Sequence, residues 1–142
     1  MTRPGFRNPD AARLRMMLGE IRTIAVVGLS PRPNRPSHQV AKAMQGFGYR
    51  IIPVRPAVDS VLGERAFPDL HALPQPVDLV NVFRNPAQLG PIVDACIALE
   101  LPRLWLQDGV VNEAAALRAQ AAGIEVVMDR CIYRDYLAFF KD

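Results

Sequence analysis

The chain has 142 residues, of which 50% are hydrophobic and 22% are charged, and its net charge at pH 7 is +3. These values predict one globular domain and exclude a disordered chain. The sequence contains no apolar run near the roughly 18 residues of a membrane span, no secretory signal and too few cysteines for a disulfide framework. We therefore expect a cytoplasmic protein without a membrane partner.

The N-terminal segment carries the whole excess of positive charge. Residues 1–23 hold five arginines and two acidic residues, and the rest of the chain is neutral overall. A short basic arm differs from the basic face of a nucleic-acid-binding domain, so we expect no nucleic-acid partner. Residues 1–9 predict a flexible arm, and Asp10 can cap a helix that extends to about Gly19. The folded domain is expected to span residues 10–142.

Five short apolar segments follow the first helix. Unbroken apolar runs of this length indicate strands that are buried on both faces, as in a parallel sheet. The predicted strands are 24–28, 51–54, 79–83, 103–106 and 124–128.

Helical segments separate these strands. They are predicted at 37–47, 69–73 as a short turn, 91–99, 112–122 and 133–140. The alternation predicts an α/β fold: a single Rossmann-like domain with a five-stranded parallel sheet in the order 3-2-1-4-5 and helices on both faces. Ligands of such sheets bind at the carboxyl ends of the strands, near the switch point beside the first strand.

The loop after the first strand has the features of an anion site. It reads Gly28-Leu29-Ser30-Pro31-Arg32-Pro33-Asn34-Arg35-Pro36-Ser37. Only the first glycine of the GxGxxG fingerprint is present, but Gly28 lets a phosphate approach the backbone, and a helix that starts at Ser37 supplies free N–H groups. Ser30 and Asn34 add hydrogen-bonding side chains. The alternative is a plain connection in which Ser37 is only a helix cap.

Three further loops are expected at the same edge of the sheet. Arg55 follows the second strand, where NAD-binding domains place an acidic residue, so it disfavours NAD and suits the phosphorylated ribose of NADP or coenzyme A. Phe83 offers a flat face to an adenine ring, and Arg84 is another phosphate candidate. Gln107 and Gly109 offer a polar side chain and a flexible turn. Solvation of Arg55 and core packing of Phe83 are the alternatives.

No set of catalytic groups accompanies these loops. Cys96 lies at an apolar helix position and is expected in the core, whereas Cys131 follows the fifth strand and could face the crevice, with Arg130 favouring its thiolate. His38 and His71 form no recognisable pair with a nucleophile. Two histidines and two cysteines without close pairing also predict no metal site.

Four segments carry motifs that resemble one protein family. They are IAVVGLSPRPNRPSHQVAKAM (24–44), GYRIIPVRP (48–56), VDLVNVFRN (77–85) and LWLQDGVVNEAAALRAQAAGIEVVMDRC (104–131). The chain resembles the small bacterial coenzyme-A-binding (CoA-binding) family, a stand-alone relative of the CoA-binding domain of succinyl-CoA synthetase α subunits. The resemblance covers about residues 10–135.

The resemblance implies a CoA molecule bound across the strand ends. The expected contact residues are Gly28, Leu29, Ser30, Asn34, Arg35 and Ser37 for the phosphate region, Pro53, Val54 and Arg55 for the nucleotide end, and Val82, Phe83, Arg84, Gln107 and Gly109 beside the adenine or pantetheine. Catalysis in the synthetase relatives uses a second domain with a phosphohistidine. We therefore expect binding of CoA or an acyl-CoA without catalysis, as a carrier, sensor or partner subunit.

Two other classes of function stay open. One is an enzyme, either a small NADP-dependent oxidoreductase or a CoA-dependent thiol enzyme that uses Cys131, and the incomplete glycine fingerprint weighs against the first. The other is an interaction module. Residues 1–23 and the apolar tail 136–140 would then contact a protein partner, or the tail would support a homodimer.

Overall fold

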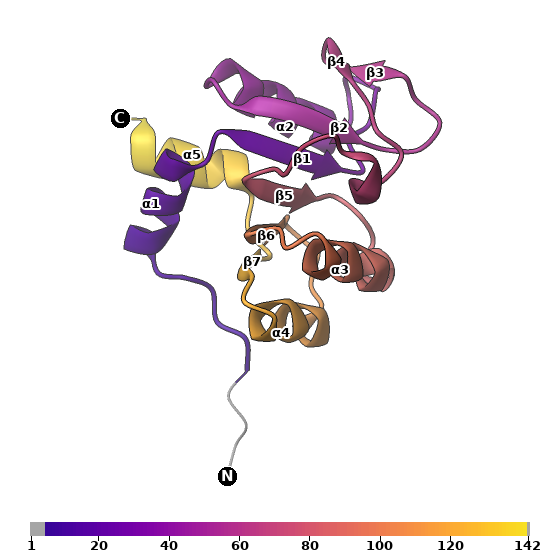
Figure 1. Cartoon of the computed structure of the whole chain (residues 1–142). Coiled ribbons are helices and arrows are strands. Elements are labelled where there is room, and N and C mark those ends of the chain that lie inside the picture. The colour runs from indigo at the N-terminus through magenta and orange to yellow at the C-terminus, as the bar shows by residue number, and fades with distance from the viewer. Residues whose placement is uncertain (1–4, 142) are drawn as a thin grey trace.

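Five parallel strands form the centre of the protein, as a computed structural model shows for residues 5–141 (Figure 1). Their order across the sheet is β2 (Arg50–Val54), β1 (Thr23–Val27), β5 (Leu79–Val82), β6 (Arg103–Leu106) and β7 (Glu125–Met128). The predicted α/β class and five-stranded parallel sheet are confirmed. Within the described range, no helix is long and apolar enough to span a membrane.

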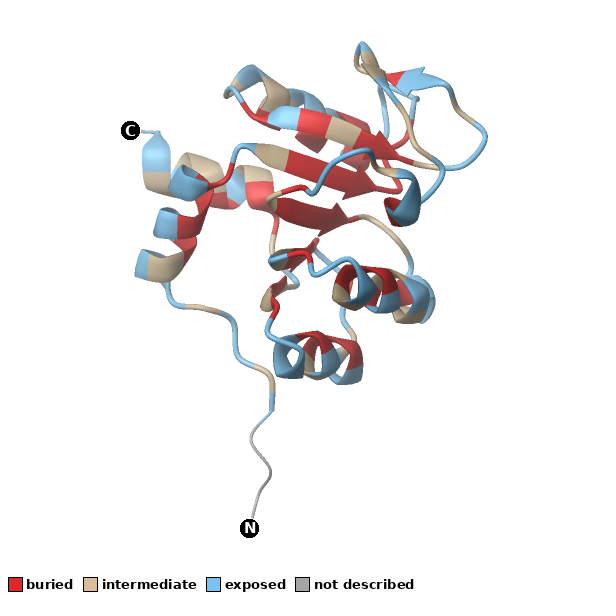
Figure 2. Cartoon of the chain, in the orientation of Figure 1, coloured by how far each residue is buried: buried red, intermediate tan, exposed pale blue. Residues whose placement is uncertain are grey.

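Helices cover both faces of this sheet. One face carries α1 (Ala11–Glu20), α2 (Pro36–Gly46) and α5 (Ile132–Phe140), and the other carries α3 (Leu89–Ala98), α4 (Glu113–Ala121) and the 3₁₀ turns η1 (Leu70–Ala72) and η2 (Pro86–Gln88). Figure 2 shows that the buried residues follow the strands and the inward sides of the helices. The core therefore has two layers, one on each side of the sheet.

The strand order differs from the expected 3-2-1-4-5. Counted along the chain, the five strands lie in the order 2-1-3-4-5, because β5 pairs with β1 instead of lying outside β2. Pro53 fits the edge position of β2, because a proline has no N–H to donate to a neighbouring strand. Its carbonyl accepts from Phe67 N (3.0 Å) on the outer side of the sheet. The N–H and C=O of one strand residue point to the same side, so the missing N–H also faces outward. The order still reverses beside β1, and the switch-point rule indicates the same edge for a ligand.

The link between β2 and β5 contains a hairpin that the sequence did not predict. Its strands are β3 (Ser60–Val61) and β4 (Glu64–Arg65). The two turn residues, Leu62 and Gly63, both have positive φ, 55° and 77°, as in a type I′ turn. Gln45 Nε2 donates to Leu62 O at 3.1 Å, which attaches the hairpin to α2.

Capping side chains mark the starts of α1, α4 and the two 3₁₀ turns. Side-chain oxygens of four N-cap residues accept a backbone N–H, and these residues are Asp10, Asp69, Asn85 and Asn112. The N-cap residues of α2, α3 and α5 make no such bond, and α3 begins at Leu89, two residues before the predicted start at Pro91. The 3₁₀ turn η2 leads directly into α3, and Leu89 already has helical backbone angles.

The described part of the N-terminal arm contacts the outer edge of β7. Asn8 Oδ1 accepts from Met128 N at 2.7 Å, and Asn8 Nδ2 donates to Met128 O at 2.9 Å. The carboxamide thus takes the place of a neighbouring strand at this edge. Phe6 packs against the core on the α3 and α4 face. Residues 1–4 of the predicted arm lie outside the described residues.

Candidate functional site

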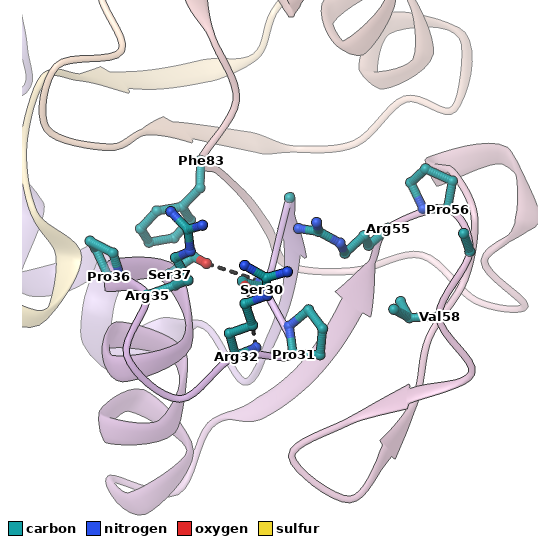
Figure 3. Close-up of a pocket in the computed structure, with 12 residues that line it drawn as sticks. Ser30, Pro31, Arg32, Arg35, Pro36, Ser37, Arg55, Pro56, Val58 and Phe83 are labelled. Atoms are coloured by element: carbon teal, nitrogen blue, oxygen red, sulfur yellow. Dashed lines mark hydrogen bonds between the residues drawn. The ribbon is translucent and has the colours of Figure 1, made fainter.

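A cleft of about 660 Å³ opens at the carboxyl ends of β1 and β2 (Figure 3). Its walls come from residues 28–37, from the loop that follows β2, and from Phe83 at the end of β5. The volume lies within the range of small-molecule sites. The cleft lies beside the reversal of strand order, where the fold class predicts a ligand.

Two buried serines hold residues 28–37 against the start of α2. Ser37 Oγ accepts from Ser30 N at 3.0 Å, and Ser30 Oγ accepts from Arg32 N at 3.1 Å. His38 Nδ1 lies 2.9 Å from Ser30 O and donates to it, since a carbonyl can only accept. Neither serine hydroxyl donates a hydrogen bond to a described residue. Both hydroxyl protons therefore remain available to a ligand oxygen.

The N-terminus of α2 faces this cleft, although Ser37 does not cap it as predicted. Pro36 occupies the first helical position and makes Arg35 the N-cap, so Ser37 is the second helical residue and its hydroxyl reaches across the loop instead. The Arg35 side chain makes no capping bond. Within the described chain, the N–H groups of Ser37 and His38 have no partner. Free N–H groups and the helix dipole together form an anion site.

Three arginines surround the same space. Arg32 and Arg35 come from the loop after β1 and Arg55 from the end of β2, and Figure 3 shows their side chains reaching toward one another. None of the ion pairs among the described residues involves these three side chains, and no described acidic residue lines the cleft. Their uncompensated charge favours a ligand with several negative charges, such as a phosphate ester.

Gly28 allows two loops to approach each other below the cleft. Its φ is +87°, and an added Cβ would lie 3.2 Å from Phe83 O and 3.3 Å from Arg84 Cδ. Its N–H donates to Val54 O at 2.9 Å and so belongs to the sheet rather than to a bound anion. Gly28 is therefore needed for the backbone shape of the site.

Arg84 and Val54 line a second pocket and not the polar cleft. This pocket of about 780 Å³ lies on the α3 side of the sheet. Apolar side chains from η1 and α3, including Leu70, Ile92 and Ala95, form much of its wall. The predicted arginine-bearing loops thus meet at one edge, but Arg84 lines a different pocket from Arg32, Arg35 and Arg55.

The other predicted contact residues lie outside the polar cleft. Leu29, Pro53 and Val82 are buried, and Asn34 is exposed. Gly109, with a φ of +79°, donates its N–H to Asp129 Oδ1 at 2.8 Å. Gln107 is buried at the end of β6 and bonds to neighbours on β5 and α5.

Sequence reasoning missed several residues of the cleft wall. Arg32 had a signal, because it stands between two prolines in the loop that was predicted to bind anions. Ala57 and Val58 had none, since their place depends on how the chain turns after β2. Ala57 has a φ of +63°, which is uncommon for a residue other than glycine and marks a constrained backbone.

The two cysteines have different surroundings. Burial raises the pKa of the Cys96 thiol to about 12. Cys131 is the N-cap of α5, is buried, and lines neither the cleft nor the second pocket. Arg130, the expected support for a thiolate, instead donates to both oxygens of Asp135, at 2.7 and 2.8 Å.

Comparison with protein families matches residues 22–136 to the family described as a CoA binding domain. The chain belongs to this family. The matched range runs from the start of β1 into α5, so this CoA-binding domain includes the polar cleft, the second pocket and Gln107. The family supports association with CoA in general.

Related proteins share most of the CoA-binding domain. Protein YneT of Bacillus subtilis (strain 168) is 44% identical over 127 residues, which is 89% of this chain and 94% of that protein. The crystal structure of Prb, the PH1109 protein redesigned for binding, has a TM-score of 0.92 at 28% identity and covers 96% of both chains. The structure of cell-free ID.343 from Thermus thermophilus has a TM-score of 0.89 at 35% identity, covering 93% of this chain and all (100%) of that one.

Proposed function

We propose that this CoA-binding domain binds CoA or an acyl-CoA in the polar cleft, with the phosphates of the ligand at the start of α2. The observation that carries the proposal is the placement of Arg32, Arg35 and Arg55 around free N–H groups, with no acidic residue in the described wall. CoA carries a diphosphate and a ribose 3′-phosphate. Its charge therefore complements that of the cleft.

The diphosphate is expected against residues 28–37. Ser30 and Ser37 offer hydroxyl protons, and Ser37 and His38 offer backbone N–H groups. Hydrogen bonds to a charged group contribute about 1.5–3 kcal/mol each. Arg55 stands at the end of β2, where the ribose of a nucleotide lies in this class of fold, and suits the 3′-phosphate.

We infer a binding role rather than catalysis at this site. The His38 Nδ1 proton is directed to Ser30 O and not to a hydroxyl oxygen, which does not suit a histidine base that activates a serine. Both cysteines are free thiols, as expected in the reducing cytoplasm where we place the protein. A carrier, a sensor or a partner subunit would use binding alone.

Thermal unfolding with CoA, acetyl-CoA, NADP⁺ and NAD⁺ tests this proposal. A ligand at 100 times its dissociation constant adds about 2.7 kcal/mol to the free energy of unfolding. We expect CoA or acetyl-CoA to raise the melting temperature by several degrees and NAD⁺ to leave it unchanged. A shift with NADP⁺ and none with either CoA compound would favour the oxidoreductase and reject the proposal.

A further inference from the structure

A small groove lies at the edge of the sheet opposite to the polar cleft. This helix-end groove has a volume of about 190 Å³ and lies where α1, α2 and α5 end, beside the amino ends of β1 and β2. α5 packs against both other helices, and Figure 1 shows it beside α1. Much of the wall is apolar and comes from Leu18, Ile21, Phe47, Tyr136 and Phe140. The volume is below that of a small-molecule site and suits one large apolar side chain.

Aromatic rings form one wall of the helix-end groove. The Phe47 and Tyr136 rings are stacked, with centres 4.0 Å apart and 13° between their planes, and the centre of the Phe140 ring lies 5.0 Å from that of Tyr136. Tyr49 meets Tyr136 edge-on at 5.9 Å, and its hydroxyl donates to Leu18 O. These contacts hold the wall in shape before any ligand arrives. Phe140 is nevertheless 38% exposed.

Two glycines leave the helix-end groove open. Gly19 and Gly48 both line it, and an added Cβ at either position would meet nothing within 4 Å. The φ of Gly48 is +106°, which accounts for a glycine there. Gly19 has no such need, because it lies in the last turn of α1, where alanine would favour the helix. The open space beside Gly19 is therefore not required by the backbone.

Three cations surround the helix-end groove. Arg22 lines it. The Arg15 guanidinium lies 5.4 Å from the centre of the Phe140 ring, and the Lys141 ammonium lies 5.4 Å from the centre of the Phe47 ring. A cation above a ring keeps its full charge. None of the ion pairs among the described residues includes these three side chains.

Two acidic residues near Arg22 have other partners. Glu20 forms ion pairs with Arg13 at 3.6 Å and with Arg103 at 3.1 Å. Asp78 Oδ2 accepts from the backbone N–H of Arg22 at 2.7 Å. Neither carboxylate forms an ion pair with the Arg22 guanidinium in the described chain. The helix-end groove thus combines an apolar interior with a positively charged rim.

We propose that the helix-end groove docks an acidic segment of a partner protein, which inserts one aromatic side chain between its carboxylates. The apolar interior favours the ring, and Arg15, Arg22 and Lys141 favour the carboxylates on either side of it. The inference is independent of CoA binding, because the helix-end groove and the polar cleft lie at opposite edges of the sheet. A partner docked there would leave the polar cleft open.

Single-stranded nucleic acid is the competing ligand for a surface that has cations and aromatic rings. Bases bind such a surface by stacking on open ring faces. Here Tyr136 and Lys141 lie against the faces of Phe47, and Arg15 lies over Phe140. These contacts occupy the faces that a base would need. An acidic peptide uses the cations and the open space instead, so the geometry favours it.

Titration of the wild-type protein with the peptide acetyl-DEDFDED-amide tests the proposal by ¹H–¹⁵N NMR. We expect the backbone signals of Gly19, Arg22 and Gly48 to shift, and the shifts to shrink as salt is added. The peptide acetyl-DEDADED-amide should bind at least about tenfold more weakly, because it lacks the ring. Groove signals that ignore millimolar peptide, or equal affinity for the two peptides, would overturn the proposal. Tighter binding of an oligothymidylate at the same signals would assign the groove to nucleic acid and overturn it as well.

The variant Gly19→Leu fills the helix-end groove from α1. Its Cβ meets nothing within 4 Å, and leucine favours a helix, so the melting temperature should not fall. We expect at least about a tenfold loss of affinity for the phenylalanine peptide, the same loss as removal of the ring. Gly46→Leu is the matched control, since Gly46 ends α2 outside the groove and also has free space around it. Unchanged peptide binding by Gly19→Leu would contradict the proposal.

The double variant Arg15→Gln/Arg22→Gln tests the charge of the rim. We expect about a fivefold loss of affinity for the phenylalanine peptide, as for two exposed ion pairs. Lys42→Gln, which removes an exposed charge from α2 outside the groove, should change little. An equal effect of the double variant and Lys42→Gln would show that the rim does not select acidic segments, against the proposal.

Discussion

Arg55 and Arg84 show how far single residues of the site follow from the sequence. Both come directly after predicted strands, and both were expected at the carboxyl edge of the sheet. Arg55 lines the polar cleft. The Arg84 side chain instead passes beside Gly28 and lines the second pocket, on the α3 face of the sheet. The strand pattern predicts the edge at which a side chain lies. It does not predict the side of the loop from which that side chain leaves, because this depends on the backbone angles of the loop.

Gly28 leads to a prediction at the scale of one residue. Gly28→Ala should lower the free energy of unfolding by about 2 kcal/mol or more, because the new Cβ meets Phe83 O at 3.2 Å in addition to the strain of a positive φ. Urea denaturation measures this loss.

Gly123→Ala is the matched control for this prediction. Gly123 also has a positive φ, +91°, but a Cβ there meets nothing within 4 Å, so only about 1 kcal/mol of backbone strain is expected. Equal losses for the two variants would mean that the close approach at Gly28 is unimportant.

At the scale of elements, the strands and most helices were predictable because each has a local signal. Short apolar runs mark the strands, and Asp10 and Asn112 mark helix starts. The strand order was not predicted correctly, although Pro53 held a clue: a proline would remove a ladder bond from an interior strand. The β3–β4 hairpin had no such signal, since its turn residues are Leu62 and Gly63 rather than Asn-Gly.

The ion pair between α1 and β7 leads to a prediction about pH. Arg13 donates to both oxygens of Glu125, at 2.7 and 2.8 Å, and this hydrogen bonding holds the pKa of the Glu125 carboxyl below its ordinary value of 4.5. A lowered pKa in the folded state means that the pair stabilises the fold above pH 4.5. This contribution is lost as the pH falls through the lowered value.

Glu125→Gln should therefore lower the free energy of unfolding by about 1 kcal/mol at pH 7. The difference from the wild-type protein should shrink as the pH falls below 4.5. Urea titrations across this range measure it, with the exposed Glu100→Gln as a control that should show little difference at any pH. A loss for Glu125→Gln that is independent of pH would contradict the role of the charge.

For the whole molecule, the two faces of the sheet differ in chemistry at the ligand edge. The α2 face carries the polar cleft with its arginines, and the α3 face carries the more apolar pocket. Pro31, Pro36 and Pro56 lie in the wall of the cleft. Proline restricts a loop before a ligand arrives, so less conformational entropy is lost on binding. This stiffness suits a long and flexible ligand such as CoA.

A crystal structure of the complex with CoA tests the central claim most directly. We predict the diphosphate within hydrogen-bonding distance of the Ser30 and Ser37 hydroxyl oxygens and of the first N–H groups of α2, with the ribose 3′-phosphate against Arg55. CoA bound away from the cleft, or a cleft whose arginines contact no phosphate of the bound ligand, would contradict the account.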